Sequence, residues 1–350
     1  MKILIVTDAW EPQVNGVVRT LKMTVRELQR LGHEVELLSP QGLRSMPCPS
    51  YPEIELALVG RGEVARRIDA FAPDCLHIAT EGPLGWLARS VALRRGWPFT
   101  TAYHSRFPEY VHARIRLPLA WSYAVLRRFH NAGVATLAPT AAIVDDLRAR
   151  GFTKPRWWSR GVDLEMFRPD GARVERDTQP VFLYVGRLAV EKQVEAFLSL
   201  DLPGEKWVAG EGPERAKLQA RYPNVRWFGV LGGPELAALY RSADVKVFPS
   251  LTDTFGLVMV EAMACGTPVA AFPVPGPIDV VGQSAGGVLD TDLRAACLRA
   301  LELPRDAVRA HAETFTWERA TQQFVEAMQP IPAMAPGRAV TPSPSGTGLG

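Results

Sequence analysis

Residues 249–271 read PSLTDTFGLVMVEAMACGTPVAA, and this stretch decides the fold of the chain. A strand rich in β-branched and aromatic residues, Val245 to Phe248, leads into a polar turn from Ser250 to Thr254. An apolar helix from Leu257 to Ala264 follows, and then a new strand from Thr267 to Phe272. A strand, a turn, a helix and another strand in this order are typical of a parallel sheet covered by helices.

Two carboxylates in this stretch lie eight positions apart, Asp253 in the turn and Glu261 on the helix. Gly256 lets the backbone approach a ligand at a helix N-terminus, whose amides and dipole favour anions. We therefore expect a nucleotide sugar here, with its phosphates near Phe255, Gly256 and Leu257 and its hydroxyls on the two acids. The simpler alternative is an N-capping Asp and an ordinary helix Glu, which the spacing of the two acids alone does not exclude.

The rest of the chain also alternates strands with helices, which predicts an α/β protein with two doubly wound parallel sheets. Predicted strands cover 2–7, 34–38, 75–79, 99–103, 134–138, 181–185, 206–209, 225–228, 245–248, 268–272 and 286–289. Predicted helices cover 17–31, 63–71, 83–95, 117–131, 140–150, 192–199, 213–221, 234–241, 257–264, 277–281 and 292–302. We place a hinge within 154–169 and expect disorder over 331–350, which is rich in Pro, Gly, Ser and Thr.

The composition is that of a soluble globular protein large enough for two domains, with 350 residues, 47% hydrophobic and 22% charged. No apolar run reaches the roughly 18–20 residues that a spanning helix needs, and we expect no signal peptide before the strand at Lys2. The four cysteines lack CxxC spacing, which favours reduced thiols in a cytoplasmic protein: Cys48, Cys75, Cys265 and Cys297.

The two halves differ in charge. Residues 1–160 hold 22 Lys and Arg against 14 Asp and Glu, a balance of +8, whereas residues 161–350 hold 18 against 23, a balance of −5. Aromatic residues are interleaved with the basic ones between residues 94 and 160, as in proteins that bind anionic membranes or nucleic acid. The alternative of solvated arginines beside core aromatics applies to most of them.

The 253–261 motif resembles the acid–seven-residues–acid motif of the family-4 retaining glycosyltransferases, with Asp253 where most members carry Glu. Residues 103–110, YHSRFPEY, resemble a His-Thr-Arg-Phe-Pro-Glu-Tyr string of a subgroup acting on lipids, which includes sulfolipid synthases and related mannosyl- and glucosyltransferases. The resemblance implies a GT-B fold with a cleft between two domains, 1–160 and 161–315. It also implies a final helix, 316–328, that returns to the first domain.

The resemblance implies roles for individual residues. Arg187 and Lys192 would neutralise the leaving diphosphate in place of a metal, and Glu261 would hold the ribose hydroxyls. Asp253 and His104 would orient the sugar. The remaining donor contacts implied are Gly16 in the turn after the first strand, Glu211, Gly212, Val230, Phe255, Gly256 and Leu257.

Acceptor and membrane contacts are expected in the first domain. Phe107 and Tyr110 would border the acceptor, and the segment from Arg114 to Arg128 would lie on an anionic membrane. Its basic residues are Arg114, Arg116, Arg127 and Arg128, accompanied by apolar residues that include Trp121, Tyr123 and Leu126.

The predicted reaction is transfer of a hexosyl unit (glucose, glucuronic acid or mannose type), with retention and without a metal or cofactor. The donor is a nucleoside-diphosphate sugar, UDP-sugar favoured, and the acceptor a membrane lipid such as diacylglycerol. We expect a cytoplasmic protein peripheral on the inner face of the plasma membrane, with no nucleic-acid partner. The alternatives are a GDP-mannose-dependent mannosyltransferase with another acceptor, a nucleotide-sugar epimerase on the same fold, and a non-catalytic lipid-binding protein.

Two further motifs have simpler explanations. Gly60 to Ala65 matches a GxGxxA dinucleotide fingerprint, but it does not follow the first strand, which disfavours NAD binding. Asp290-Thr291-Asp292 mimics the metal motif of the other glycosyltransferase fold, yet it precedes a predicted helix, where capping explains it.

Overall fold

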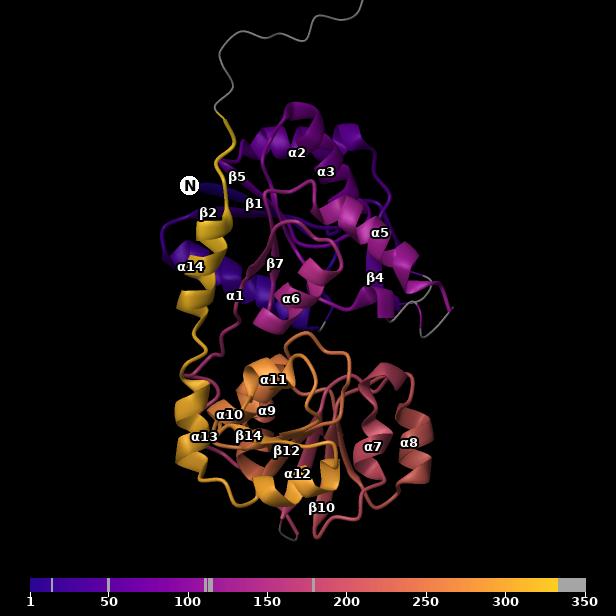
Figure 1. Cartoon of the computed structure of the whole chain (residues 1–350), viewed down its shortest axis with the longest axis vertical. Coiled ribbons are helices and arrows are strands. Elements are labelled where there is room, and N and C mark those ends of the chain that lie inside the picture. The colour runs from indigo at the N-terminus through magenta and orange to yellow at the C-terminus, as the bar shows by residue number, and fades with distance from the viewer. Residues whose placement is uncertain (14, 49–50, 110–111, 113–115, 178–179, 333–350) are drawn as a thin grey trace, which may run out of the picture.

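The computed structural model describes residues 1–13, 15–48, 51–109, 112, 116–177 and 180–332. Each of its two lobes is built on a six-stranded parallel sheet, as the alternating pattern predicted. The lobes are stacked along the long axis of the molecule (Figure 1). Of the predicted disordered tail 331–350, residues 333–350 lie outside the described residues, as do the predicted acceptor residue Tyr110 and Arg114. The prediction is wrong for Ile331, whose backbone N donates to Asp74 O at 2.7 Å.

The central strands of the first sheet are buried on both faces, so both faces of the sheet contribute to the hydrophobic core of this lobe. Its strands follow in the order β2 (Glu34–Leu38), β1 (Lys2–Val6), β5 (Cys75–Ile78), β6 (Thr100–Ala102), β7 (Ala135–Ala138) and β8 (Pro155–Trp157). Its connections carry α1 (Gly16–Arg30), α2 (Arg61–Phe71), α3 (Pro83–Arg95), α5 (Leu119–His130) and α6 (Ala141–Ala149).

The second sheet has the strand order of a dinucleotide-type fold, with the reversal between β9 and β12. Its strands run β11 (Arg226–Gly229), β10 (Glu205–Ala209), β9 (Val181–Val185), β12 (Val245–Phe248), β13 (Val269–Ala271) and β14 (Gly287–Leu289). Its helices are η1 (Val190–Lys192), α7 (Val194–Leu198), α8 (Arg215–Arg221), α9 (Gly233–Ser242), α10 (Leu257–Ala264), α11 (Pro277–Val280), α12 (Leu293–Ala300) and α13 (Arg305–Ala312).

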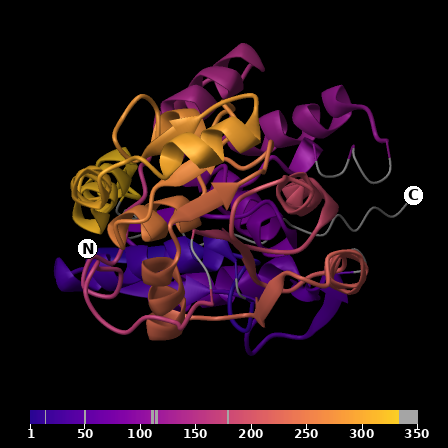
Figure 2. The same cartoon turned by 90° about the horizontal axis from the view of Figure 1, so that it is seen from below.

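The last helix, α14 (Trp317–Ala327), leaves the second lobe and packs on α1 of the first. Both views show α13 and α14, in yellow, along one side of the molecule (Figure 1 and Figure 2). The two chain crossings run side by side, because Val162 N donates to Phe315 O at 3.1 Å. Ser159 N also donates to Gln323 Oε1 on α14, at 2.8 Å. The boundary between domains at residue 160 stays a prediction, and the crossing lies between β8 and β9.

Four elements were not predicted: the antiparallel hairpin of β3 (Ser45–Cys48) and β4 (Tyr51–Ala57), the short strand β8, and α13. The hairpin explains why the GxGxxA sequence at Gly60 to Ala65 is not a dinucleotide site. Gly60 precedes α2 but follows a strand of the antiparallel hairpin, whereas the fingerprint requires a strand of the parallel sheet. Asp292 caps α12 by accepting from Arg294 N and Ala295 N, as the capping interpretation required. The other predicted elements agree with the structure within a few residues at each end.

Gly161 is the tightest point of the crossing. A Cβ at this position would lie 2.2 Å from Trp317 N and 2.6 Å from Thr316 C, which are backbone atoms that no rotamer change moves. We predict that Gly161→Ala costs at least about 1–3 kcal/mol of unfolding free energy, because two backbone segments must separate. Gly62→Ala, on α2 with nothing within 4 Å, is the matched control and should be neutral or slightly stabilising. Thermal denaturation measures both, and equal melting temperatures for the two variants would contradict the prediction.

Candidate active site

The predicted donor residues cluster at the point where the second sheet reverses its strand order. Gly186 and Arg187 directly follow β9, and Asp253 lies in the turn after β12, which is the neighbour of β9 in the sheet. Ligands of doubly wound sheets bind outside the carboxyl ends of the strands at such a switch point. The topology therefore brings together residues that lie more than sixty positions apart in the chain.

Lys192 and Asp253 form an ion pair, with 2.5 Å between Lys192 Nζ and Asp253 Oδ1. Burial acts to raise the pKa of Asp253, but the charge and hydrogen bond of Lys192 outweigh it and hold the pKa below its ordinary value. Asp253 is therefore an ionised acceptor of hydrogen bonds, suited to sugar hydroxyls. The predicted cation and the predicted acid neutralise each other in this ion pair.

Glu261, on α10, is 6% exposed and has both carboxylate oxygens occupied. Arg19 Nη1, from α1 of the first lobe, donates to Oε1, and the Tyr240 hydroxyl donates to Oε2 at 3.1 Å. Burial raises the pKa of Glu261, and Arg19, Tyr240 and Lys246 reduce that rise without cancelling it. The carboxylate that should hold the ribose is thus bound to an arginine from the other lobe.

The N-terminus of α10 has the geometry of an anion site. Gly256 precedes it with φ of 87°, and no side chain caps the helix. A Cβ at Gly256 would meet Met259 Cε at 2.8 Å and the Phe248 ring at 2.9 Å, so glycine is required for packing as well as for φ. Phe255 is buried against Phe315, and Leu257 is partly buried against the cores of both lobes.

The start of α1 differs, because its amides are already bonded. Asn15 Oδ1 accepts from Val17 N and Val18 N, each at 3.0 Å. A Cβ at Gly16 would meet no atom of the described residues within 4 Å, so these residues leave room beside this glycine. The predicted approach of a diphosphate to Gly16 stays a prediction, with room for it but fewer available amides than an uncapped helix would offer.

His104 lies after β6, and its carbonyl oxygen accepts from the hydroxyl of Thr254 of the second lobe at 2.7 Å. Its Nε2 is buried and has no protein partner among the described residues. Burial, then Arg160 and two further histidines, hold its pKa well below the ordinary value, so the ring is neutral. A neutral imidazole beside the Asp253 turn is suited to hydrogen bonding with a sugar hydroxyl.

The predicted contacts at Glu211, Gly212 and Val230 are less direct. The Glu211 carbonyl accepts from Leu188 N at 2.8 Å, and its carboxylate pairs with Arg215. Gly212 allows the two loops to approach, since a Cβ there would lie 2.3 Å from Leu188 O. Val230 is exposed after β11. Their donor contacts stay predictions, and the structure gives Gly212 a packing role.

The predicted membrane segment divides into an inner and an outer face on α5. Tyr123 and Leu126 are buried, so their expected place on the membrane side is wrong. Trp121 is 71% exposed, Val125 is 54% exposed, and Arg128 follows on the same face. Arg116 and Phe107 are exposed as well, whereas Arg127 Nη1 donates to Arg150 O at 3.2 Å inside the fold.

Many of the basic residues of the first half have acidic partners. Arg106 lies 3.9 Å from Glu109 and 3.6 Å from Asp146, and Arg150 lies 2.8 Å from Asp146. The net positive charge around Arg106 and Arg150 is therefore smaller than the count of basic residues in this part of the sequence suggests. Within the described residues, the helices are too short or too polar to cross a membrane.

Sequence reasoning assigned no role to Arg19, Tyr240 or Lys246. Lys246 on β12 is fully buried, with Nζ donating to Val247 O at 2.8 Å and lying 4.9 Å from the centre of the Tyr184 ring. The charges of Asp253 and Glu261 act on it from the site above. The only signal in the sequence was a lysine among the apolar residues of a predicted central strand.

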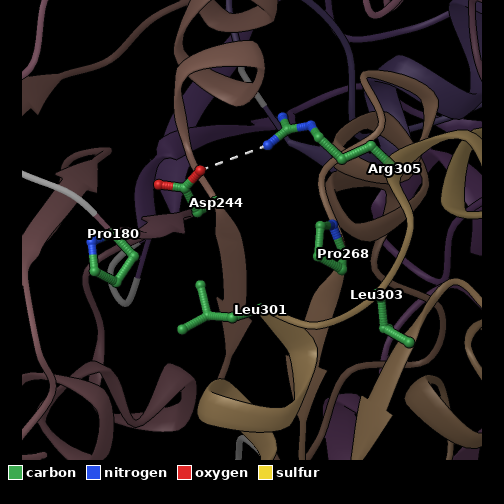
Figure 3. A pocket seen from close by; sticks show the side chains of 6 residues that line it. All are labelled: Pro180, Asp244, Pro268, Leu301, Leu303 and Arg305. Carbon is green, nitrogen blue, oxygen red and sulfur yellow. Dashed lines mark ion pairs between the residues drawn. The ribbon is translucent and has the colours of Figure 1, made fainter.

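A cavity of about 370 Å³ lies at the opposite end of the second sheet. Three of its lining residues, Pro180, Asp244 and Pro268, directly precede β9, β12 and β13, and so mark the amino ends of these strands. Figure 3 shows Asp244 paired with Arg305 there, 3.7 Å apart. None of its lining residues is a predicted site residue, and ligands of such sheets bind at the other end.

Two parallel sheets whose carboxyl ends meet through acids and cations define a GT-B glycosyltransferase. The chain belongs to glycosyltransferase family 4. A model described as Glycosyltransferase Family 4 matches residues 14–166, and a model of Glycosyl transferases group 1 matches residues 179–303. The predicted family and fold class are thereby confirmed.

Relatives agree with this assignment. A GDP-mannose-dependent alpha-mannosyltransferase of Mycobacterium tuberculosis is 31% identical over 83% of this chain and 83% of its own. An alpha-monoglucosyldiacylglycerol synthase of Streptococcus pneumoniae is 25% identical over 86% of this chain and 78% of its own. Among solved structures, sucrose-phosphate synthase from Thermosynechococcus elongatus superposes with a TM-score of 0.75 at 19% identity, covering 93% of this chain and 97% of that one, and so shares the fold.

Lys246 gives a pH-dependent prediction. Burial lowers its pKa from 10.5 to about 7, so the folded protein holds this proton less tightly than the unfolded chain does. The resulting destabilisation is complete below pH 7 and declines as pH rises toward 10.5. We predict that Lys246→Met stabilises the protein by roughly 1–3 kcal/mol at pH 7, on the scale seen when buried charges are replaced by apolar groups.

The gain should shrink between pH 7 and pH 10, as measured by denaturant unfolding at several pH values. Lys217→Met, at a lysine whose side chain is 62% exposed, is the control and should change little at any pH. A Lys246→Met protein less stable than the parent at pH 7 would show that the buried ammonium is a net stabilising group.

Proposed function

We propose that the protein transfers a hexosyl unit from a nucleoside-diphosphate sugar to a hydroxyl of a membrane lipid such as diacylglycerol, with retention at the anomeric carbon. One observation carries the proposal: the Lys192–Asp253 pair lies at the sheet switch point, and Thr254 in the same turn bonds the backbone of His104 in the facing lobe. A cation suited to a diphosphate, Lys192, and an acceptor suited to sugar hydroxyls, Asp253, therefore lie at the interface between the two lobes.

The leaving group determines the chemistry. Negative charge develops on the diphosphate as the glycosidic bond breaks, and fixed cations stabilise this charge in the transition state. Arg187 and Lys192 serve this purpose, together with the uncapped N-terminus of α10. Asp253 stays ionised and paired, so it orients the sugar rather than donating a proton. The leaving phosphate itself accepts the proton of the acceptor hydroxyl, which gives front-face substitution.

The lipid acceptor has two supports. The streptococcal relative is by its name a synthase of a glucosyldiacylglycerol. The outer face of α5 exposes Trp121 and Val125 beside Arg128, which is the composition of an interfacial surface that binds without spanning. Docking of this face on the inner leaflet of the plasma membrane would bring a lipid hydroxyl to Phe107 near the interface of the lobes.

A second donor is favoured by a specific observation. The mycobacterial relative is by name dependent on GDP-mannose, so mannosyl transfer from GDP-mannose is the alternative to transfer from a UDP-sugar. Assays with UDP-glucose, UDP-glucuronic acid and GDP-mannose in parallel, with and without diacylglycerol in vesicles, distinguish the two. Product formed without any acceptor would instead indicate an epimerase.

We predict that transfer proceeds in excess EDTA at the rate seen with magnesium. Lys192→Met should lower kcat by about 10²–10³, the scale for losing one preorganised partner of the transition state. Lys217→Met removes an exposed lysine and should leave kcat unchanged. The measurement is radiolabelled sugar incorporated into lipid. Activity abolished by EDTA and restored by magnesium would overturn the assignment of these cations.

Membrane binding should depend on the outer face of α5. Each basic residue near an anionic leaflet contributes about 1 kcal/mol, and salt screens this attraction. We predict that changing Arg116, Arg128, Trp121 and Val125 to Ser abolishes sedimentation with vesicles containing phosphatidylglycerol. Arg66→Ser with Arg94→Ser removes two exposed arginines of the same lobe and is the control. Binding that is equal on neutral and anionic vesicles, and unaffected by the four changes, would refute this surface.

A further inference from the structure

Arg19, on α1 of the first lobe, bonds a predicted donor-binding carboxylate directly. Its guanidinium donates to Glu261 Oε1 across the interface of the lobes, from a position 242 residues away in the chain. The side chain is 34% exposed, whereas the carboxylate that it holds is 8% exposed. The arginine therefore has solvent on one side into which it can move, and the acid does not.

Each oxygen of the Glu261 carboxylate already accepts one hydrogen bond, so ribose hydroxyls that approach the carboxylate compete with Arg19 and Tyr240 for it. Tyr240 is buried on α9 of the same lobe as Glu261, and its hydroxyl holds Oε2 in place. Arg19 comes from the other lobe and is the more exposed of the two partners. Of the two contacts, that with Arg19 is the one that ribose hydroxyls can displace.

The position of Arg19 on α1 determines where the released guanidinium goes. It lies three residues after Gly16, hence on the same face of the helix, where neighbouring Cβ atoms are about 5–6 Å apart. No atom of the described residues would lie within 4 Å of a Cβ at Gly16. Asn15 already occupies two of the amides that an uncapped helix would offer to a phosphate. A side chain is therefore needed to supply positive charge at this end of α1.

The charges of the site agree. Arg187 and Lys192 balance Asp253 and Glu261, and Lys246 beneath the two acids is only partly protonated near pH 7 because burial lowers its pKa to about 7. A diphosphate adds negative charge to this site, so a further cation would favour its binding. Arg19 is a cation of the first lobe that reaches a carboxylate of the second lobe at this interface. Releasing it from Glu261 moves its charge to the group that needs it, while neutral ribose hydroxyls take its place.

We propose that Arg19 is a donor-binding residue that exchanges partners: Glu261 holds its guanidinium in the donor-free protein, and the diphosphate holds it once the ribose has taken the carboxylate. This rests on the proposed function, because it requires a nucleoside-diphosphate donor. It makes Arg19 a third diphosphate cation beside Arg187 and Lys192, supplied by the lobe that carries the acceptor.

The test compares a nucleoside with its diphosphate in the full-length protein. Calorimetry measures the Kd of UDP and uridine, and of GDP and guanosine, for the parent, Arg19→Gln and Arg19→Lys. Arg19→Gln should weaken diphosphate binding about ten- to a hundredfold, the scale of one charged hydrogen bond. It should leave nucleoside binding unchanged or tighter, because Glu261 becomes available to the ribose. Arg19→Lys should restore part of the diphosphate affinity.

Arg26→Gln is the matched control. Arg26 lies on the same helix, is 64% exposed at its side chain and pairs with Asp163 at 3.8 Å, and its removal should change neither affinity. Melting temperatures verify that each variant is folded. If Arg19→Gln changed the nucleoside and diphosphate affinities by the same factor, Arg19 would only hold the two lobes together and would not bind the diphosphate. If the parent bound neither diphosphate, the proposed function itself would fail.

Discussion

The candidate site depends on a charge constraint: two acids and two cations lie close together where access to water is limited. Isolated charges in such a setting are costly, so each needs a partner of opposite charge. Lys192 therefore pairs with Asp253, and Arg19 with Glu261. Under the proposed function, the phosphate and hydroxyl groups of a nucleotide sugar would take over bonds that these pairs now make with each other.

The two acids of one helix–turn unit have opposite pKa shifts for a physical reason. Asp253 has a lysine at 2.5 Å, whose charge and hydrogen bond outweigh burial and lower its pKa. Glu261 is buried more deeply on α10, and there burial outweighs Arg19, Tyr240 and Lys246 and raises its pKa. Removal of Arg19 or Lys246 would raise the pKa of Glu261 further. Lys246 also acts on Asp253, so a change at this lysine affects the pKa of both acids.

Sequence predicted the parts of the fold that depend on local pattern, and it failed where the cause is long-range. Alternating hydrophobic strands and glycine turns predicted both parallel sheets. The β3–β4 hairpin was missed because Pro47 and Pro52 interrupt its strands, and α13 because Pro304 and a charged sequence hide its short apolar face. In the site, Asp253 and Glu261 were found by their spacing. Arg19 was missed, because nothing local links it to a carboxylate on the other lobe.

The net charge of a stretch of sequence does not give the charge of the surface that it forms. The first half carries an excess of eight positive charges, yet Arg106 and Arg150 are bound to acids, and Arg127 donates to a carbonyl within the fold. What remains outside is a narrow face of α5 on which Trp121 and Val125 lie beside Arg128. The proposed interfacial binding would then depend on two exposed apolar side chains as much as on charge. Because apolar burial is not screened by salt, part of the affinity should persist where the electrostatic part is lost.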